Sequence, residues 1–293
     1  TGPGTSPGQR GRWHSRVRGL AEFAGGLPVS VLAEEIQPPG QGQVRGLMTI
    51  AGNPVLSTPD GRGLDLALEQ LDFMVSIDFY INETTRHANL ILPPASPLTQ
   101  FHYDLIFNAF AVRRVARLNV PVRERTADER ADWEIVNGLG LAYATAAGKP
   151  WQPLPPPRTM IAAGLARGGS GLSIEDLVAA PHGIDLGPLR PSLLSRLETA
   201  SGKIEAAPPL LLAELDRLAE QIGRSSPSTG LKLIGRRDVR SNNSWMHNAP
   251  RLVKGKSRHQ LLMHPEDVAE RRIEAGARIR IRCARCFRPR FAQ

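Results

Sequence analysis

The sequence predicts an α/β protein in which a parallel sheet wrapped by helices is followed by a β-rich module. Between residues 46 and 93, short apolar runs are separated by a helical pattern, and the runs stop at Gly, Asn, Asp or Pro. Short connections between strand, helix and strand are typical of parallel sheets. Beyond residue 230, apolar and polar residues alternate at the period of a strand.

The first strand and helix of this sheet have clear signals. Residues 47–51 form an apolar run that stops at Gly52-Asn53-Pro54, which predicts a buried strand ending in a turn. A helix is predicted after Asp60-Gly61, because three leucines follow at the spacing i, i+4 and i+7 of one helix face. These are Leu64, Leu68 and Leu71.

Two more strands follow along the chain. The run 73–77 ends at Asp78, and a short segment then leads to the run 89–92, which two prolines close. The carboxyl ends of parallel strands meet at one edge of the sheet, and ligands bind there in such folds. We therefore expect Gly52 and Asn53 to face the same crevice as Asp78.

The middle of the chain predicts helices joined by connectors. A helix is expected over residues 132–147, followed by a connector with five prolines over residues 148–158. Another helix is predicted to start at Pro208-Pro209, with Gly223 just past its end. Its apolar residues are expected to point inward: Leu212, Leu215, Leu218 and Ile222.

A Ser/Pro stretch at residues 225–229 predicts a linker between a first domain of residues 1–224 and a β-rich module of residues 230–282. The module is expected to hold one short helix, which begins at Pro265. Three strands are predicted in the module, at residues 231–234, 259–263 and 277–282, before an atypical tail at residues 283–293. Three strands are fewer than an independent sheet usually requires.

Composition and charge exclude several classes of protein. With 41% hydrophobic and 22% charged residues, the 293-residue chain is ordinary for a globular protein, and two cysteines cannot build a disulfide framework. No apolar run is long enough for a membrane span and no signal peptide is present, so a cytoplasmic location is expected. Residues 251–293 carry +8 of the net charge of +9, which disfavours a nucleic-acid surface spread over the whole fold.

Searches for metal and nucleophile motifs are nearly empty. The seven histidines lack HExxH spacing, and neither GxSxG nor a Walker-type loop occurs. Cys283 and Cys286 form a CxxC, but a zinc site needs two more ligands. We therefore expect no catalytic residues and no metal ligands in this chain.

A nucleotide-type ligand is the chemistry that the strand ends favour. A glycine such as Gly52 lets a ligand approach the backbone, Asn53 offers both a donor and an acceptor, and Asp78 can accept hydrogen bonds from a ribose or a base. A plain turn and a helix N-cap are the alternatives. The polar and aromatic cluster 242–248, preceded by Gly235-Arg236-Arg237, could surround a polar heterocycle with phosphates.

Residues 51–54, 73–78 and 82–93 together resemble the molybdopterin oxidoreductase family, which includes formate dehydrogenases, nitrate reductases and dimethyl sulfoxide reductase. The resemblance covers about residues 10–282, and Asn89 stands where the family usually has Asp. It implies that this region holds the guanosine end of a molybdopterin guanine dinucleotide. The residues implied to line that crevice are Gly52, Asn53, Ser76 and Asp78, with Asp132 also meeting the guanine.

A second resemblance, to the start of the family's C-terminal β-barrel domain, is carried by residues 233–237, 242–248, 261–269 and 273–277. There the Gly-Arg loop and its polar successor wrap the pterin and phosphate portions of the cofactor. The residues carried over are Gly235, Arg236, Asn243, Trp245 and His247.

The resemblance implies a two-electron oxidoreductase with molybdenum held by two molybdopterin guanine dinucleotides, a small-molecule substrate and an electron-transfer partner protein. The family's 4Fe-4S cluster and its protein ligand to molybdenum belong to segments that this chain lacks. We therefore expect a fragment, truncated at both ends and inactive alone. The alternatives are a non-catalytic nucleotide-binding or assembly module, and a nucleic-acid binder acting through the Arg-rich end.

Overall fold

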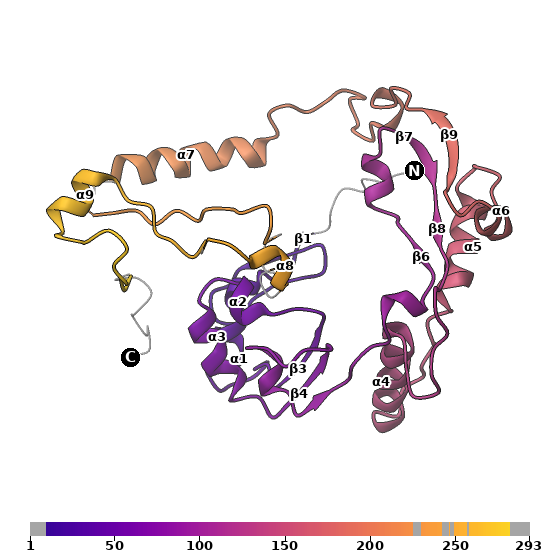
Figure 1. Ribbon diagram of the computed structural model, residues 1–293, viewed down its shortest axis with the longest axis horizontal. Coiled ribbons are helices and arrows are strands. Elements are labelled where there is room, and N and C mark those ends of the chain that lie inside the picture. The colour runs from indigo at the N-terminus through magenta and orange to yellow at the C-terminus, as the bar shows by residue number, and fades with distance from the viewer. Residues whose placement is uncertain (1–9, 225–229, 242–245, 247–248, 257, 282–293) are drawn as a thin grey trace. The chain divides into compact units, whose positions relative to one another are not determined.

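Three parallel strands form the predicted sheet in the computed structural model (Figure 1). They are β3 (Gly46–Ile50), β4 (Phe73–Ile77) and β5 (Leu90–Ile91), hydrogen-bonded in that order. Ile50 pairs with Ile77, and Ser76 pairs with Ile91. The α/β class with a parallel sheet is therefore confirmed, and the strands lie close to the predicted residues.

The structure describes residues 10–224, 230–241, 246, 249–256 and 258–281. Internal contacts divide the chain into unit 1, Thr1–Glu205, and unit 2, Ala206–Gln293. This division falls before the predicted linker at residues 225–229, which lies outside the described residues, so the predicted domain boundary stays a prediction.

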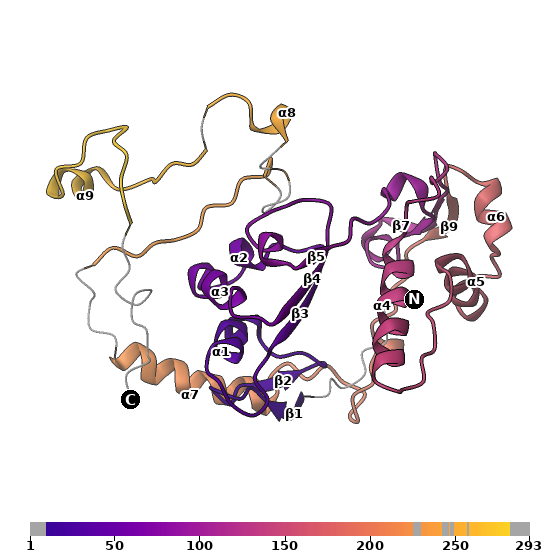
Figure 2. The ribbon, with the colours of Figure 1, turned by 90° about the horizontal axis from the view of Figure 1, so that it is seen from below.

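Three helices cover one face of the sheet (Figure 2). They are α1 (Leu32–Ile36), α2 (Pro54–Ser57) and α3 (Gly61–Leu68). Leu64 and Leu68 point into the core as predicted, and the buried core cluster consists of Ile36, Leu64, Ala67, Leu68 and Met74. Glycine is required where α3 starts, because a Cβ on Gly61 would lie 2.0 Å from the carbonyl oxygen of Val55.

The opposite face of β3 is open, which corrects the prediction of a buried strand. Met48 and Ile50 are 49% and 52% exposed, whereas Leu47 packs against the helical core. β3 is one of the two edge strands of the sheet. A continuous apolar run is typical of a parallel strand that is covered on both faces. The run at residues 47–51 has this pattern, so it could not reveal that β3 lies at an edge with one face open.

An antiparallel hairpin precedes the sheet. It consists of β1 (Arg10–His14) and β2 (Ala21–Phe23). Glu22 is buried and accepts from the Arg12 guanidinium, with 2.7 Å between Nη2 and Oε1, and from the backbone N–H of Gly25. The hairpin is tied to α1 because Glu35 Oε1 accepts from the N–H of Val17 at 3.1 Å.

A second core lies in the rest of unit 1. Two antiparallel pairs, β6 (His102–Tyr103) with β8 (Leu118–Asn119) and β7 (Arg113–Ala116) with β9 (Ile184–Pro188), pack with helices α5 (Pro157–Arg167) and α6 (Ile174–Ala179). Its buried residues are Ala116, Leu118, Leu165, Ile174 and Leu177. The 3-10 helices of unit 1 are η1 (Val29–Val31), η2 (Thr85–His87), η3 (Pro97–Thr99), η4 (Phe107–Phe110) and η5 (Leu194–Arg196).

The predicted helix at residues 132–147 is confirmed as α4 (Asp132–Ala146). The proline-rich connector lies against it, because the Asn137 amide bonds to the backbone N–H and C=O of Leu154 at 2.8 and 3.0 Å. Trp151 packs so closely that a Cβ on Gly140 would lie 2.2 Å from its indole ring.

Unit 2 contains α7 (Pro209–Arg224), α8 (Pro250–Val253) and α9 (Pro265–Glu270). The helices starting at Pro209 and Pro265 are confirmed. Two details of α7 were predicted wrongly: Gly223 lies within the helix, and the residues expected to point inward are exposed in unit 2, namely Leu212, Leu215, Leu218 and Ile222.

The described residues of 230–281 include no strand, so the three strands of the β-rich module and the β-barrel that the resemblance implies stay predictions. The tail at residues 283–293 lies outside the described residues. Among the described helices, none has both the length and the apolar character that crossing a membrane would require.

Acid titration tests the hairpin contact. The hydrogen bond from Arg12 is the largest cause that lowers the pKa of Glu22 from 4.5 to about 2. A carboxyl group with a lower pKa in the folded state stabilises the fold above its unfolded pKa and loses this effect as the pH falls toward the folded pKa. We expect the urea-unfolding midpoint of wild type to exceed that of Glu22→Gln near neutral pH, and the difference to shrink between pH 4.5 and pH 2.

The matched control is Glu124→Gln, which neutralises an exposed carboxylate of the same unit. Near neutral pH its urea-unfolding midpoint should stay close to that of wild type, because the side chain is exposed. A difference between wild type and Glu22→Gln that stays constant from neutral pH to pH 2 would contradict the role assigned to Glu22.

Candidate functional site

The strand ends bring Asn53 and Asp78 to the carboxyl edge of the sheet, as predicted. Ala51 follows β3 directly and donates its N–H to the carbonyl oxygen of Ile77, at 2.9 Å. It has a φ of 49°, a left-handed conformation that is uncommon for a residue with a Cβ. The chain therefore turns sharply after β3, and Gly52 and Asn53 lie in that turn, before α2.

Thr84 connects this turn to the segment after β4. Its side chain is fully buried. The hydroxyl donates to Asn53 Oδ1 at 2.8 Å and accepts from the N–H of Val55 at 3.1 Å. Asn53 also donates from Nδ2 to Glu83 Oε2 at 2.7 Å. Both polar atoms of the Asn53 side chain are therefore held by neighbouring residues.

Asn82 continues the network toward Asp78. Its Oδ1 accepts from the N–H groups of Thr84 and Thr85, at 2.9 and 3.0 Å. Its Nδ2 lies 3.4 Å from Asp78 Oδ2, and the other carboxylate oxygen accepts from the N–H of Tyr80 at 3.0 Å. Asn53 and Asp78 are thus joined through Thr84 and Asn82, and Asp78 is 9% exposed.

Ser76, by contrast, is fully buried within β4. Its hydroxyl lies 2.8 Å from that of Thr49 on the neighbouring strand. This contact joins β3 and β4, and the residue is enclosed rather than open to a ligand. Its predicted contact with the nucleotide stays a prediction.

Asp132 is exposed at the first position of α4. The chain two residues before it approaches the segment that follows β5, because the N–H of Ala95 donates to the carbonyl oxygen of Arg130 at 2.7 Å. Glu134 stabilises the same helix end by accepting from the N–H of Ala131 at 2.7 Å. Asp132 therefore lies on a helix that is anchored beyond the end of the third strand.

A charged cluster fastens η2, and with it Thr84 and Thr85, to α3. The Asp65 carboxylate is hydrogen-bonded to two side chains of η2, those of Arg86 and His87. His87 Nε2 lies 2.7 Å from Asp65 Oδ1, and Arg86 Nη2 lies within 2.7 Å of both carboxylate oxygens. The hydrogen bond with His87, followed by that from Arg86, lowers the pKa of the Asp65 carboxyl. Asp65 therefore stays ionised and holds the segment in place.

The C-terminal candidates belong to unit 2, so their position is described only within that unit. Gly235 and Arg236 are exposed and lie in a stretch without regular secondary structure. Asn243, Trp245 and His247 lie outside the described residues. The roles predicted for all five stay predictions.

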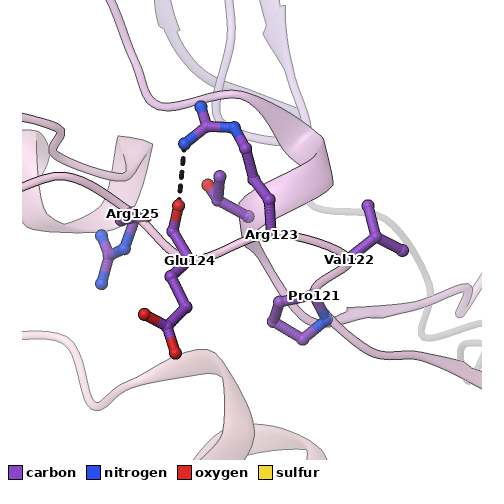
Figure 3. Close-up of a pocket in the computed structure, with 6 residues that line it drawn as sticks. Pro121, Val122, Arg123, Glu124 and Arg125 are labelled. Atoms are coloured by element: carbon purple, nitrogen blue, oxygen red, sulfur yellow. Dashed lines mark hydrogen bonds between the residues drawn. The ribbon is translucent and has the colours of Figure 1, made fainter.

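An open pocket of about 350 Å³ lies elsewhere in unit 1 (Figure 3). Its lining contains none of the predicted site residues: Thr99, Pro121, Val122, Arg123, Glu124 and Arg125. Both arginines are paired with carboxylates, Arg123 with Glu129 and Arg125 with Glu134. The hydrogen bond from Arg123 lowers the pKa of Glu129 to about 2. Each guanidinium charge in the pocket is therefore offset by a carboxylate, which disfavours the binding of an anion there.

The chemistry of the carboxyl edge is therefore hydrogen bonding through carboxylates and amides. Among the described residues, no group of three or more His, Cys, Asp and Glu could hold a metal ion. Sequence reasoning missed Asn82, Glu83 and Thr84 as members of the network. Glu83 and Thr84 lie in residues 82–93, one of the segments that resemble the molybdopterin oxidoreductase family, and that resemblance was the signal that could have identified them.

Comparison with known proteins agrees with the resemblance. Residues 231–286 match the family described as "Molydopterin dinucleotide binding domain". Gly235 and Arg236 lie within the matched range. The resemblance to molybdopterin-dependent oxidoreductases is therefore confirmed.

Two relatives illustrate how partial the likeness is. The chain is 30% identical to the assimilatory nitrate reductase catalytic subunit of Bacillus subtilis over 109 residues, which are 37% of this chain and 15% of that protein. It is 32% identical to the F420-dependent formate dehydrogenase 1 subunit alpha of Methanococcus maripaludis over 97 residues, which are 33% and 14% of the two chains. The match thus spans about one seventh of each relative.

The hydroxyl of Thr84 gives a direct test of the network. Thr84→Val keeps the shape of the side chain but leaves Val55 N–H and Asn53 Oδ1 without this partner. Loss of a buried hydrogen-bond partner costs about 1–3 kcal/mol, so we expect the free energy of unfolding in urea to fall by that amount.

Thr84→Ser is the matched control, because it keeps the hydroxyl and removes one methyl group, worth about 0.8 kcal/mol. It should be more stable than Thr84→Val. Equal stabilities of the two variants would show that the hydrogen bonds of Thr84 do not hold the turn.

Proposed function

We propose that this chain supplies part of the surface that binds molybdopterin guanine dinucleotide in a molybdenum-dependent oxidoreductase. The carboxyl edge of unit 1 takes the guanine nucleotide end, and residues 231–286 contribute to the pterin and phosphate portions. The observation that carries the proposal is the hydrogen-bonded connection of Asn53 to Asp78 at one sheet edge. The match of residues 231–286 to a molybdopterin dinucleotide binding domain supports it independently.

The chemistry of Asp78 suits guanine. Guanine presents two neighbouring donors, N1–H and N2–H, and a carboxylate can accept from both. Asp78 Oδ2 accepts from Asn82 only at 3.4 Å, which is a long hydrogen bond, so this oxygen keeps acceptor capacity. Adenine lacks this pair of donors, and the edge should therefore prefer guanine.

The cofactor itself would supply two-electron redox chemistry at molybdenum. The residues of this chain would bind and orient it. Asp78 would hold the base, Asp132 at the start of α4 would approach from the segment beyond β5, and the Arg236 guanidinium would pair with phosphate oxygens. Oxidation or reduction of a small-molecule substrate, with a partner protein exchanging electrons, belongs to this proposal for the whole enzyme.

A non-catalytic nucleotide-binding or assembly module is the second candidate. Unit 1 favours it in one respect, because the whole network from Asn53 to Asp78 lies within that unit. Such a module would bind a guanine nucleotide without retaining the pterin.

The guanine assignment is tested by titration calorimetry of the full chain with GDP and ADP. We expect wild type to prefer GDP, and Asp78→Asn to weaken GDP binding about ten-fold or more, because hydrogen bonds to a charged group contribute about 1.5–3 kcal/mol. ADP binding should change little. The substitution retains an Oδ1 that can accept from Tyr80.

Glu69→Gln is the matched control, since it removes one negative charge from the exposed end of α3. It should leave GDP affinity unchanged. Wild-type binding that does not distinguish GDP from ADP would argue against the guanine assignment.

Metal analysis of the purified chain separates the cofactor proposals. None of the residues of this sequence is expected to be the protein ligand that molybdenum has in the family. We therefore predict neither stoichiometric molybdenum nor dye-linked oxidoreductase activity for this chain alone. Stoichiometric molybdenum with activity would refute the predicted inactivity. GDP binding combined with failure to take up pterin from an extract rich in the cofactor would favour the nucleotide-binding module.

A further inference from the structure

An exposed aromatic pair follows the central strand of the sheet. Phe79 and Tyr80 come directly after Asp78, and their side chains are 64% and 67% exposed. Their ring centroids lie 4.7 Å apart with an angle of 53° between the ring planes. Together the two rings present a large apolar surface, and burying it against a ligand would be favourable.

The backbone that carries the pair is held from two sides. Asp78 Oδ1 accepts from the N–H of Tyr80 at 3.0 Å, and the Thr85 hydroxyl donates to the carbonyl oxygen of Tyr80 at 2.8 Å. Thr85 is itself fully buried and also accepts from the N–H of Asn82 at 2.8 Å. The rings are therefore exposed on a fixed backbone, so that a ligand contacting them would not have to order the loop first.

The position of the pair beside Asp78 indicates what it binds. Planar bases stack on exposed aromatic rings, and the carboxylate of Asp78, which directly precedes the pair in the chain, can accept hydrogen bonds from a base edge. A platform for the flat face and an acceptor for the edge together match a nucleobase, whereas an apolar protein segment would gain nothing from the carboxylate.

We propose that Phe79 and Tyr80 form a stacking platform for the base of the nucleotide whose edge Asp78 accepts. This inference rests on the proposed function and extends it from hydrogen bonding at the edge of the base to contact with its face. Stacking is tolerant of base identity, so the platform supplies affinity while Asp78 supplies the preference for guanine.

The test compares GDP with ribose 5-phosphate, which lacks a base, by titration calorimetry of the full chain. Replacing both rings, Phe79→Ala with Tyr80→Ala, should weaken GDP binding about ten-fold or more and leave ribose 5-phosphate binding unchanged. Tyr80→Phe keeps a ring and should retain wild-type affinity. Ile81→Ala is the matched control, because it truncates the next exposed apolar residue, which is 81% exposed.

Unfolding midpoints of all variants should agree with wild type, since the truncated side chains are exposed. GDP affinity that is unchanged in the double variant, while Asp78→Asn still weakens it, would overturn the platform and leave the guanine assignment intact. Equal losses in Ile81→Ala and in the double variant would also overturn it. Absence of GDP binding by wild type would overturn both proposals together.

Discussion

The arrangement of residues at the carboxyl edge of the sheet depends on the two hydrogen bonds of the buried Thr84 hydroxyl. One oxygen atom serves the turn after β3, by donating to Asn53, and the start of α2, by accepting from Val55. Asn82 accepts from the N–H of Thr84 and donates to Asp78, which connects the two residues. Asp65 on α3 binds Arg86 and so fixes the segment that follows Thr84. Buried hydrogen bonds of this kind do not compete with water, so they fix geometry strongly. Thr84, which would not touch a ligand itself, thus positions Asn53 at the edge of the site.

The strands and helices around this edge could be predicted because their signals are local. A run such as residues 73–77 and the leucine spacing of α3 need no knowledge of the rest of the chain. The shared edge of Asn53 and Asp78 also followed from a general rule on parallel strands. The hydrogen bonds that hold Asn53 and the start of α2 could not be predicted, since they join residues 29 to 31 positions apart that meet only in the fold.

Burial was less predictable than secondary structure. The periodicity of α7 identified a helix and its apolar face, but a period does not say what covers that face, and in unit 2 the leucines are exposed. The same limit applies to β3, where an apolar run could not reveal that the strand forms an edge. The strands at residues 231–234 and 277–282 stay predictions, because pairing with a neighbouring strand is a tertiary property that a local pattern does not specify.

The uneven cover of the sheet makes two of its methionines chemically different. Met74 on β4 is fully buried under α1 and α3, whereas Met48 on β3 is half exposed on the open face. Oxidation to the sulfoxide follows access to the sulfur and converts an apolar side chain into a polar one. Met48 can therefore record, by its reactivity toward peroxide, whether a further part of a larger assembly covers this face. Met74 provides the internal reference within the same sheet.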